Sequence, residues 1–205
     1  MLTLAIDSAT EACSVALLED GRLLAGDFRM LGRGHAEHLV PMIAKLPGKG
    51  RAPRIAVALG PGSFTGVRVG LAAARALALA WRAELVGYPT LALVAAMARR
   101  GGAEPVAAAM TGGHGEWFVQ GFAADGLASR PLASLRPDDA AAQTPERIIA
   151  GSQAAALVAA RGHGEALPLW PDARELGLLG DTHFLPDVQP LYGRAPDARL
   201  PEPSR

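Results

Sequence analysis

A glycine-rich turn, Gly60 to Gly66, constrains the fold of this chain more than any other feature. Its sequence GPGSFTG follows the apolar run 54–59 and precedes VRVGLAAARALALAW, which is rich in alanine and leucine. Glycine allows backbone conformations that other residues avoid, and alanine and leucine are strong helix formers. The pattern predicts a buried strand, a tight turn and a helix over Val67 to Arg82.

The residues before this turn predict a three-stranded antiparallel meander and a helix. Two apolar runs, 2–6 and 13–18, flank the turn-prone segment DSATEA, and an Asp-Gly pair precedes a third run, 22–28. Apolar residues then recur at helical spacing over 35–46, where we expect Pro41 to bend or restart the helix.

The residues after the turn complete a mixed α/β pattern. Glu84 to Gly87 is a short apolar run, and we expect Thr90 to cap a helix from about 91 to 99. The first half therefore has the order βββαβαβα, which is also the order of one lobe of the actin and hexokinase type fold. The second half predicts shorter elements, with strands over 106–110, 117–122 and 147–150 and a helix over 154–160.

These patterns predict two lobes of unequal size. We expect an N-terminal ribonuclease H-like lobe over residues 1–101, a smaller degenerate lobe over 102–195, and a disordered tail over 196–205 that is rich in proline.

Charge and cysteine content narrow the function classes. The 205 residues carry 20 basic and 20 acidic side chains without a long run of either sign, which disfavours strong RNA binding by this chain alone. Cys13 is the single cysteine, so no internal disulfide forms and a reducing compartment fits. We find neither a signal peptide nor a stretch that is apolar over the span of a membrane helix, and predict a cytoplasmic protein.

The first hairpin and the glycine-rich turn are candidates for binding a nucleotide or another anion. The residues concerned are Asp7, Thr10, Gly60, Gly62 and Ser63. The first N–H groups of the following helix face outward, and an aspartate can orient magnesium-bound water. However, the lysine of a Walker loop is absent, and the facing segment MTGGHGEW offers no aspartate for phosphoryl transfer. We favour a tight strand-to-helix connection for the glycines and an Asx-type turn for Asp7.

The histidines do not predict a metal centre. His35 and His38 are three residues apart, whereas a zincin-like helix needs HxxxH, and no third ligand is near. Ser63 lacks the GxSxG context of a nucleophile. We therefore predict no metal, no cofactor and no catalytic residue.

A stripe of small residues follows the glycine-rich turn. Gly66, Gly70, Ala74 and Ala78 are four apart, so they share one helix face. The stripe fits either burial against the chain's own sheet or close approach of a partner helix, and the sequence leaves both open.

Four segments together resemble the bacterial TsaB family, also called YeaZ. They are LAIDSATEACSVAL, GRGHAEHLVPMI, GPGSFTGVRVGLAAARALA and PLYGRAPDA. The resemblance implies a non-catalytic, degenerate member of the actin/hexokinase-like (ASKHA, ribonuclease H-like) class, with mixed sheets, packed helices and a reduced second lobe.

The resemblance also implies partners. In this family the two helices after the meander pack on matching helices in a homodimer or of TsaD, which attaches a threonylcarbamoyl group to the tRNA adenosine next to the anticodon. An ATPase, TsaE, completes the assembly, and tRNA is reached only through it. The interface candidates carried over are His35, His38, Leu39, Met42, Val67, Gly70, Leu71 and Ala74.

Two other function classes remain open. A kinase or ATPase-like enzyme would use Asp7, Thr10 and the glycine-rich turn, and a metallopeptidase would need a ligand set that the sequence lacks. The chain also departs from the family where an Asp-Ala-Arg turn commonly opens the second lobe, since it has AAAMTGGHGEWFV there. The segments of the helix pair match the family, so we favour partner binding through these helices over any contact that needs the Asp-Ala-Arg turn.

Overall fold

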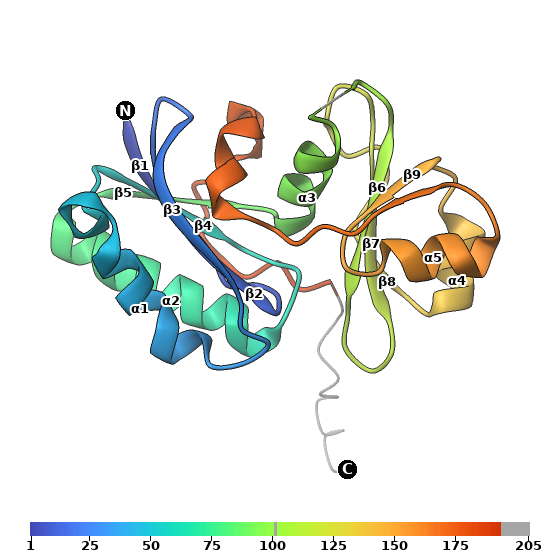
Figure 1. Cartoon of the computed structure of the whole chain (residues 1–205), viewed down its shortest axis with the longest axis horizontal. Coiled ribbons are helices and arrows are strands. Elements are labelled where there is room, and N and C mark those ends of the chain that lie inside the picture. The colour runs from blue at the N-terminus through green and yellow to red at the C-terminus, as the bar shows by residue number, and fades with distance from the viewer. Residues whose placement is uncertain (101, 194–205) are drawn as a thin grey trace, which may run out of the picture.

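The opening meander forms half of a five-stranded mixed sheet in the computed structural model, which describes residues 1–100 and 102–193 (Figure 1). The first three strands are antiparallel, and the last two run parallel to β1. The strand order is β3-β2-β1-β4-β5. The strands are β1 Leu2–Asp7, β2 Ala12–Glu19, β3 Arg22–Met30, β4 Arg54–Ala58 and β5 Glu84–Tyr88.

Helices cover both faces of this first sheet. Helices α1 (His35–Lys45) and α2 (Phe64–Trp81) lie on one face, and α3 (Thr90–Ala98) with the 3₁₀ helix η2 (Ala173–Leu178) lies on the other (Figure 1). Helix α1 runs through Pro41 without restarting. A short 3₁₀ turn, η1 (Pro47–Gly50), follows it.

The predicted cap of α3 is wrong. Thr90 is the first residue of the helix, Pro89 holds the cap position, and no side chain caps the helix. The backbone N–H of Thr90 donates to the carbonyl of Gly60 at 2.9 Å, so this end of α3 is held by the glycine-rich turn instead.

The second sheet has the order β10-β9-β6-β7-β8 and is flanked by short helices. Strands β6 and β7 are its longest, and α3 packs between them and the first sheet (Figure 1). The elements are β6 Val106–Thr111, β7 Trp117–Phe122, β8 Ala133–Leu135, α4 Pro137–Gln143, β9 Ile148–Ala150, α5 Ala154–Arg161 and β10 Glu165–Leu167. Two mixed sheets with packed helices confirm the predicted actin/hexokinase-like fold class.

Residues 170–191, here called the C-terminal strap, return to the first sheet. The backbone N–H of Ala173 donates to Ser14 Oγ at 2.8 Å, and that of Leu191 donates to the carbonyl of Leu59 at 2.8 Å. Leu185 bridges to Gly87, and η3 (Asp181–His183) lies within the strap. The division into lobes at residue 101 stays a prediction, and the predicted tail 196–205 lies outside the described residues.

The sequence analysis found no stretch apolar enough to span a membrane, and helix α2 corrects this. By length and composition it is the one helix of the described chain that could cross a membrane. Core helices meet the same criteria, and α2 buries Gly66, Gly70, Ala74 and Ala78 against strands of the first sheet.

Candidate functional site

The first turn, between β1 and β2, is held by its own side chains. Asp7 Oδ1 accepts from the N–H of Ala9 at 3.0 Å, which is the predicted Asx-type turn. Thr10 Oγ1 accepts from the N–H of Ala12 at 3.2 Å, and Ser8 Oγ donates to the carbonyl of Gly66 at 2.9 Å. All three polar side chains are buried, so their hydrogen bonds serve the fold.

Close contact with this first turn explains the glycines of GPGSFTG. A Cβ atom at Gly62 would lie 1.9 Å from the carbonyl oxygen of Ala9, and one at Gly66 would lie 2.2 Å from that of Ser8. Ser63 also joins the two turns, because its N–H donates to the Ala9 carbonyl at 2.6 Å. Its Oγ accepts from the N–H of Gly66 at 3.3 Å and so caps α2.

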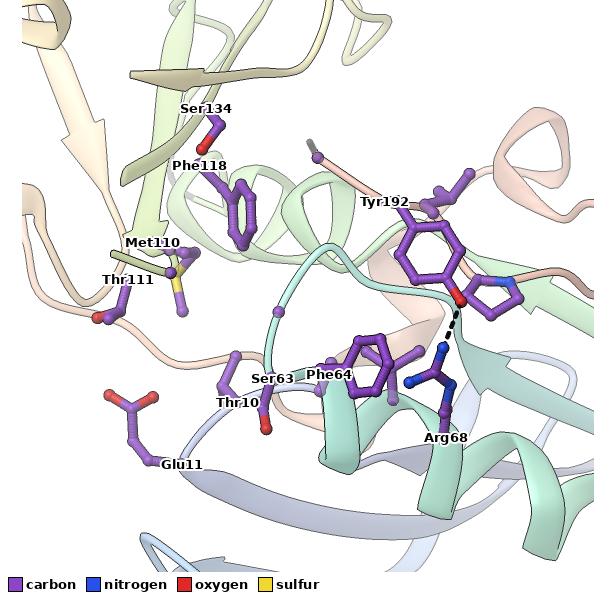
Figure 2. A pocket seen from close by; sticks show the side chains of 18 of the residues that line it. Thr10, Glu11, Ser63, Phe64, Arg68, Met110, Thr111, Phe118, Ser134 and Tyr192 are labelled. Atoms are coloured by element: carbon purple, nitrogen blue, oxygen red, sulfur yellow. Dashed lines mark hydrogen bonds between the residues drawn. The ribbon is translucent and has the colours of Figure 1, made fainter. Parts of the chain in front are cut away.

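A pocket of about 700 Å³ opens beside these two turns, between the sheets (Figure 2). Its walls come from the first turn, the start of α2, the hairpin of β6 and β7, strand β8, and the end of the strap with the two residues that follow it. The pocket-facing side chains are mostly apolar and include Phe64, Val67, Met110, Phe118, Leu191 and Tyr192.

Two charged side chains from the first half line the pocket, and both are held in place. Glu11 Oε1 accepts from Trp170 Nε1 at 2.7 Å, which ties the first turn to the strap. The guanidinium of Arg68 lies 3.2 Å from the centroid of the Phe64 ring and donates to the Tyr192 hydroxyl at 3.0 Å.

The structure divides the five residues predicted for nucleotide or anion binding. Thr10, Gly62 and Ser63 line the pocket. Asp7 is fully buried away from the lining, and Gly60 is covered by Val67 and Leu191. Burial raises the pKa of Asp7 from 3.8 to about 7, while its bond from Ala9 opposes the rise.

The predicted interface residues are mostly covered by this chain's own core. Of the eight, only the side chain of His38 is exposed. The other seven are buried, with Val67 at the wall of the pocket, and a Cβ atom added at Gly70 would lie 2.5 Å from Ser8 Oγ. For the small-residue stripe the structure therefore favours burial against the chain's own sheet.

The histidine pair separates in space. His35 is buried, with Nε2 3.3 Å from the Ala12 carbonyl oxygen, whereas His38 faces outward. Within residues 1–100 and 102–193, no group of three or more His, Cys, Asp or Glu side chains is placed to hold a metal ion.

The sequence reasoning missed most walls of the pocket. Phe118 and Tyr192 are 74 residues apart and carry no shared motif, so only the fold brings them near α2. The pairing of Glu11 with Trp170 spans 159 residues and gave no signal for the same reason.

Comparison with known proteins identifies the family. The family model of TsaD, tRNA N6-adenosine threonylcarbamoyltransferase, matches residues 29–133, about half of the chain. The tRNA threonylcarbamoyladenosine biosynthesis protein TsaB of Escherichia coli (strain K12) is 42% identical over 124 residues, which cover 58% of this chain and 53% of that protein. The Bacillus subtilis (strain 168) TsaB is 33% identical over 104 residues, which cover 48% of this chain and 45% of that protein.

These alignments span about half the length of the curated relatives, whereas a solved structure aligns almost throughout. YeaZ from Pseudomonas aeruginosa superimposes with a TM-score of 0.77 at 31% identity, covering 93% of this chain and 99% of that chain. With the fold, the glycine-rich turn and these matches in agreement, the chain belongs to the TsaB (YeaZ) family.

Proposed function

We propose that this chain is a non-catalytic subunit that pairs with a TsaD-type catalytic subunit in the biosynthesis of threonylcarbamoyladenosine in tRNA. Family membership supports the pathway, because the E. coli relative is named for tRNA threonylcarbamoyladenosine biosynthesis. Within this proposal the protein is cytoplasmic, a TsaE-type ATPase joins the complex, and tRNA is contacted only through it.

An exposed apolar surface on the paired helices carries the proposal. On α1 and α2 the residues that face away from the sheet are largely small or apolar, and Leu79 is 84% exposed. We call this surface the helix-pair face; it consists of Ala36, Val40, Pro41, Ala44, Ala72, Ala76, Leu79 and Ala80. Small side chains allow another helix pair to approach closely, and clustered exposed apolar groups are typical of interaction surfaces.

The proposed docking contacts lie on the exposed side of α1 and α2, whereas most of the interface residues implied by the resemblance lie on the buried side. The buried residues carried over from the resemblance hold α1 and α2 on the sheet and so position this face, whereas the exposed residues make the contact. His38 is exposed on α1 and remains a contact candidate. A homodimer through the same face would compete with the catalytic partner.

Co-purification tests the proposal with substitutions that the fold tolerates. Tagged protein should recover its host's TsaD, and Ala76→Arg and Val40→Arg should each abolish recovery, because both positions are exposed and a long cation blocks close helix packing. Leu127→Arg is the matched control, since Leu127 is 49% exposed between β7 and β8.

The outcomes separate partner docking from other roles. Loss in both helix variants with normal circular dichroism, alongside retention in the control, supports the proposal. Equal recovery by all variants removes the helix-pair face as the interface. Depletion of the protein should also lower threonylcarbamoyladenosine in bulk tRNA, and unchanged levels contradict the pathway itself.

A further inference from the structure

The pocket beside the glycine-rich turn has a chemistry that docking through the helix-pair face does not use. A phosphate in this pocket would meet little free positive charge: no lysine is among the described residues that line it, and its one arginine, Arg68, contacts the Phe64 ring and the Tyr192 hydroxyl. Phe64, the first residue of α2, also places an apolar side chain, 65% exposed, at the pocket. The pocket is therefore poorly suited to a phosphate group.

The apolar walls suit a compact hydrophobic body. Phe118 and Met110 from the second sheet face Phe64 and the start of α2 across the pocket (Figure 2). A volume of about 700 Å³ lies within the range of pockets that enclose small organic molecules, and aromatic side chains commonly line such pockets.

The described residues that line the pocket include one carboxylate, Glu11, and one guanidinium, Arg68. Trp170 donates to Oε1, and the carboxylate is turned toward the side of the pocket that carries Thr111 (Figure 2). Arg68 is already engaged by the Phe64 ring and the Tyr192 hydroxyl, and His114 lies exposed at the rim.

We propose that the pocket binds a small organic cation, with an apolar or aromatic body between Phe64 and Phe118 and an ammonium group at Glu11. The carboxylate supplies a charge-assisted hydrogen bond, and the apolar walls enclose the body of the ligand. This activity goes beyond partner docking, because it uses a surface made by both sheets and the strap.

Two probes of equal body and opposite charge test the proposal. Binding of 4-phenylbutylamine and of 4-phenylbutyrate to the full chain is measured by ligand-observed NMR and calorimetry at pH 7. Probes of this size bind with dissociation constants on the order of millimolar. We expect the amine to bind at least about tenfold more tightly than the carboxylate, as a charge-assisted contact allows.

Matched variants locate the bound amine. Glu11→Gln keeps an oxygen that can accept from Trp170 but removes the charge, so it should weaken amine binding about tenfold. Glu37→Gln, on the exposed part of α1, should leave it unchanged. Phe64→Ala removes an exposed wall and should weaken binding of the amine without unfolding the protein.

Three results would overturn the proposal. They are tighter binding of the carboxylate than of the amine, unchanged amine affinity in Glu11→Gln, and no amine binding up to about 10 mM, well above the expected range. Heat of binding or hydrolysis with magnesium and ATP would also count against it, because the protein would then accept a phosphate-bearing anion.

Discussion

Tyr88 and Asp7 meet inside the first sheet, where the tyrosine hydroxyl lies 3.3 Å from Asp7 Oδ2 and neither side chain is exposed. The same hydroxyl lies 3.1 Å from the carbonyl oxygen of Ile6, so it serves two acceptors at the end of β1. A carboxyl group so deep in the core links the stability of this fold to pH.

The wild-type protein should lose stability as the pH rises from about 4 to 7, and Asp7→Asn should abolish this loss. The pKa of Asp7 rises from 3.8 to about 7 on folding, so the folded state holds a proton that the unfolded state releases in this range. The free energy of unfolding then falls with rising pH, by about 4 kcal/mol in all, and levels off above pH 7. Urea unfolding of both proteins at pH 4, 5.5 and 8 measures the difference.

The stabilising effect of Asp7→Asn, relative to the wild type, should grow with pH across that window. Asparagine keeps an oxygen for the N–H of Ala9, so the turn itself is preserved. Parallel pH profiles of the two proteins would contradict a raised pKa for Asp7.

Tyr88→Phe should destabilise the protein by about 1–2 kcal/mol, because it leaves buried acceptors without their donor. It should also raise the pKa of Asp7 further, since the bond from Tyr88 lowers it. Tyr192→Phe is the control, because Tyr192 is 56% exposed and its loss should change stability by less than about 0.5 kcal/mol. Equal effects of the two changes would argue against a buried role for Tyr88.

Gly66→Ala should destabilise the fold by about 1–3 kcal/mol, because its Cβ would lie 2.2 Å from the backbone oxygen of Ser8. Gly70→Ala should cost about 1 kcal/mol, since the Ser8 hydroxyl that it meets can rotate away only by losing its hydrogen bond to the Gly66 carbonyl. Ala72→Ser, exposed on the same helix, is the control. Thermal unfolding ranks the three, and a Gly66→Ala protein as stable as the control would show that the turns are not in tight contact.

Arg130→Met should destabilise the second sheet by about 3 kcal/mol, because it leaves a buried carboxylate without its partner. Arg130 donates to Glu146 at 3.1 and 2.7 Å, and the Glu146 side chain is only 7% exposed. Adding Glu146→Leu to this variant should restore much of the loss, since the uncompensated charge is then gone. A double variant no more stable than Arg130→Met alone would contradict this account.

The long elements could be predicted from the sequence because each carries its own period or turn signal. Helix α2 and strands β1 to β5 lie close to their predicted bounds. Strands β8 and β10 have three residues each, too few to show alternation of apolar and polar residues. The short 3₁₀ helix η2 has no periodic sequence pattern of its own. The strap was missed because the hydrogen bonds that hold it on the sheet join residues far apart in the sequence. One example is the bond from the N–H of Ala173 to Ser14 Oγ.

The candidate site could be predicted only in its local parts. The Asx turn at Asp7 and the tight connection at Gly62 follow from neighbouring residues, and both are confirmed. The sequence could not show that Asp7 is fully buried, because its burial depends on packing of Tyr88 from another strand. For Gly70, spacing alone could not decide between the chain's own sheet and a partner.

The strap also sets an order of assembly during synthesis. Helix α3 ends at Ala98, whereas η2, which covers β2 and β3, begins roughly 75 residues later at Ala173. At about 5–20 residues per second, a ribosome holds the nascent first sheet for about 4–15 s without η2 over β2 and β3. A chain that stops early or is cleaved before Ala173 would keep these two strands without η2, which makes such a fragment a target for chaperones and proteases.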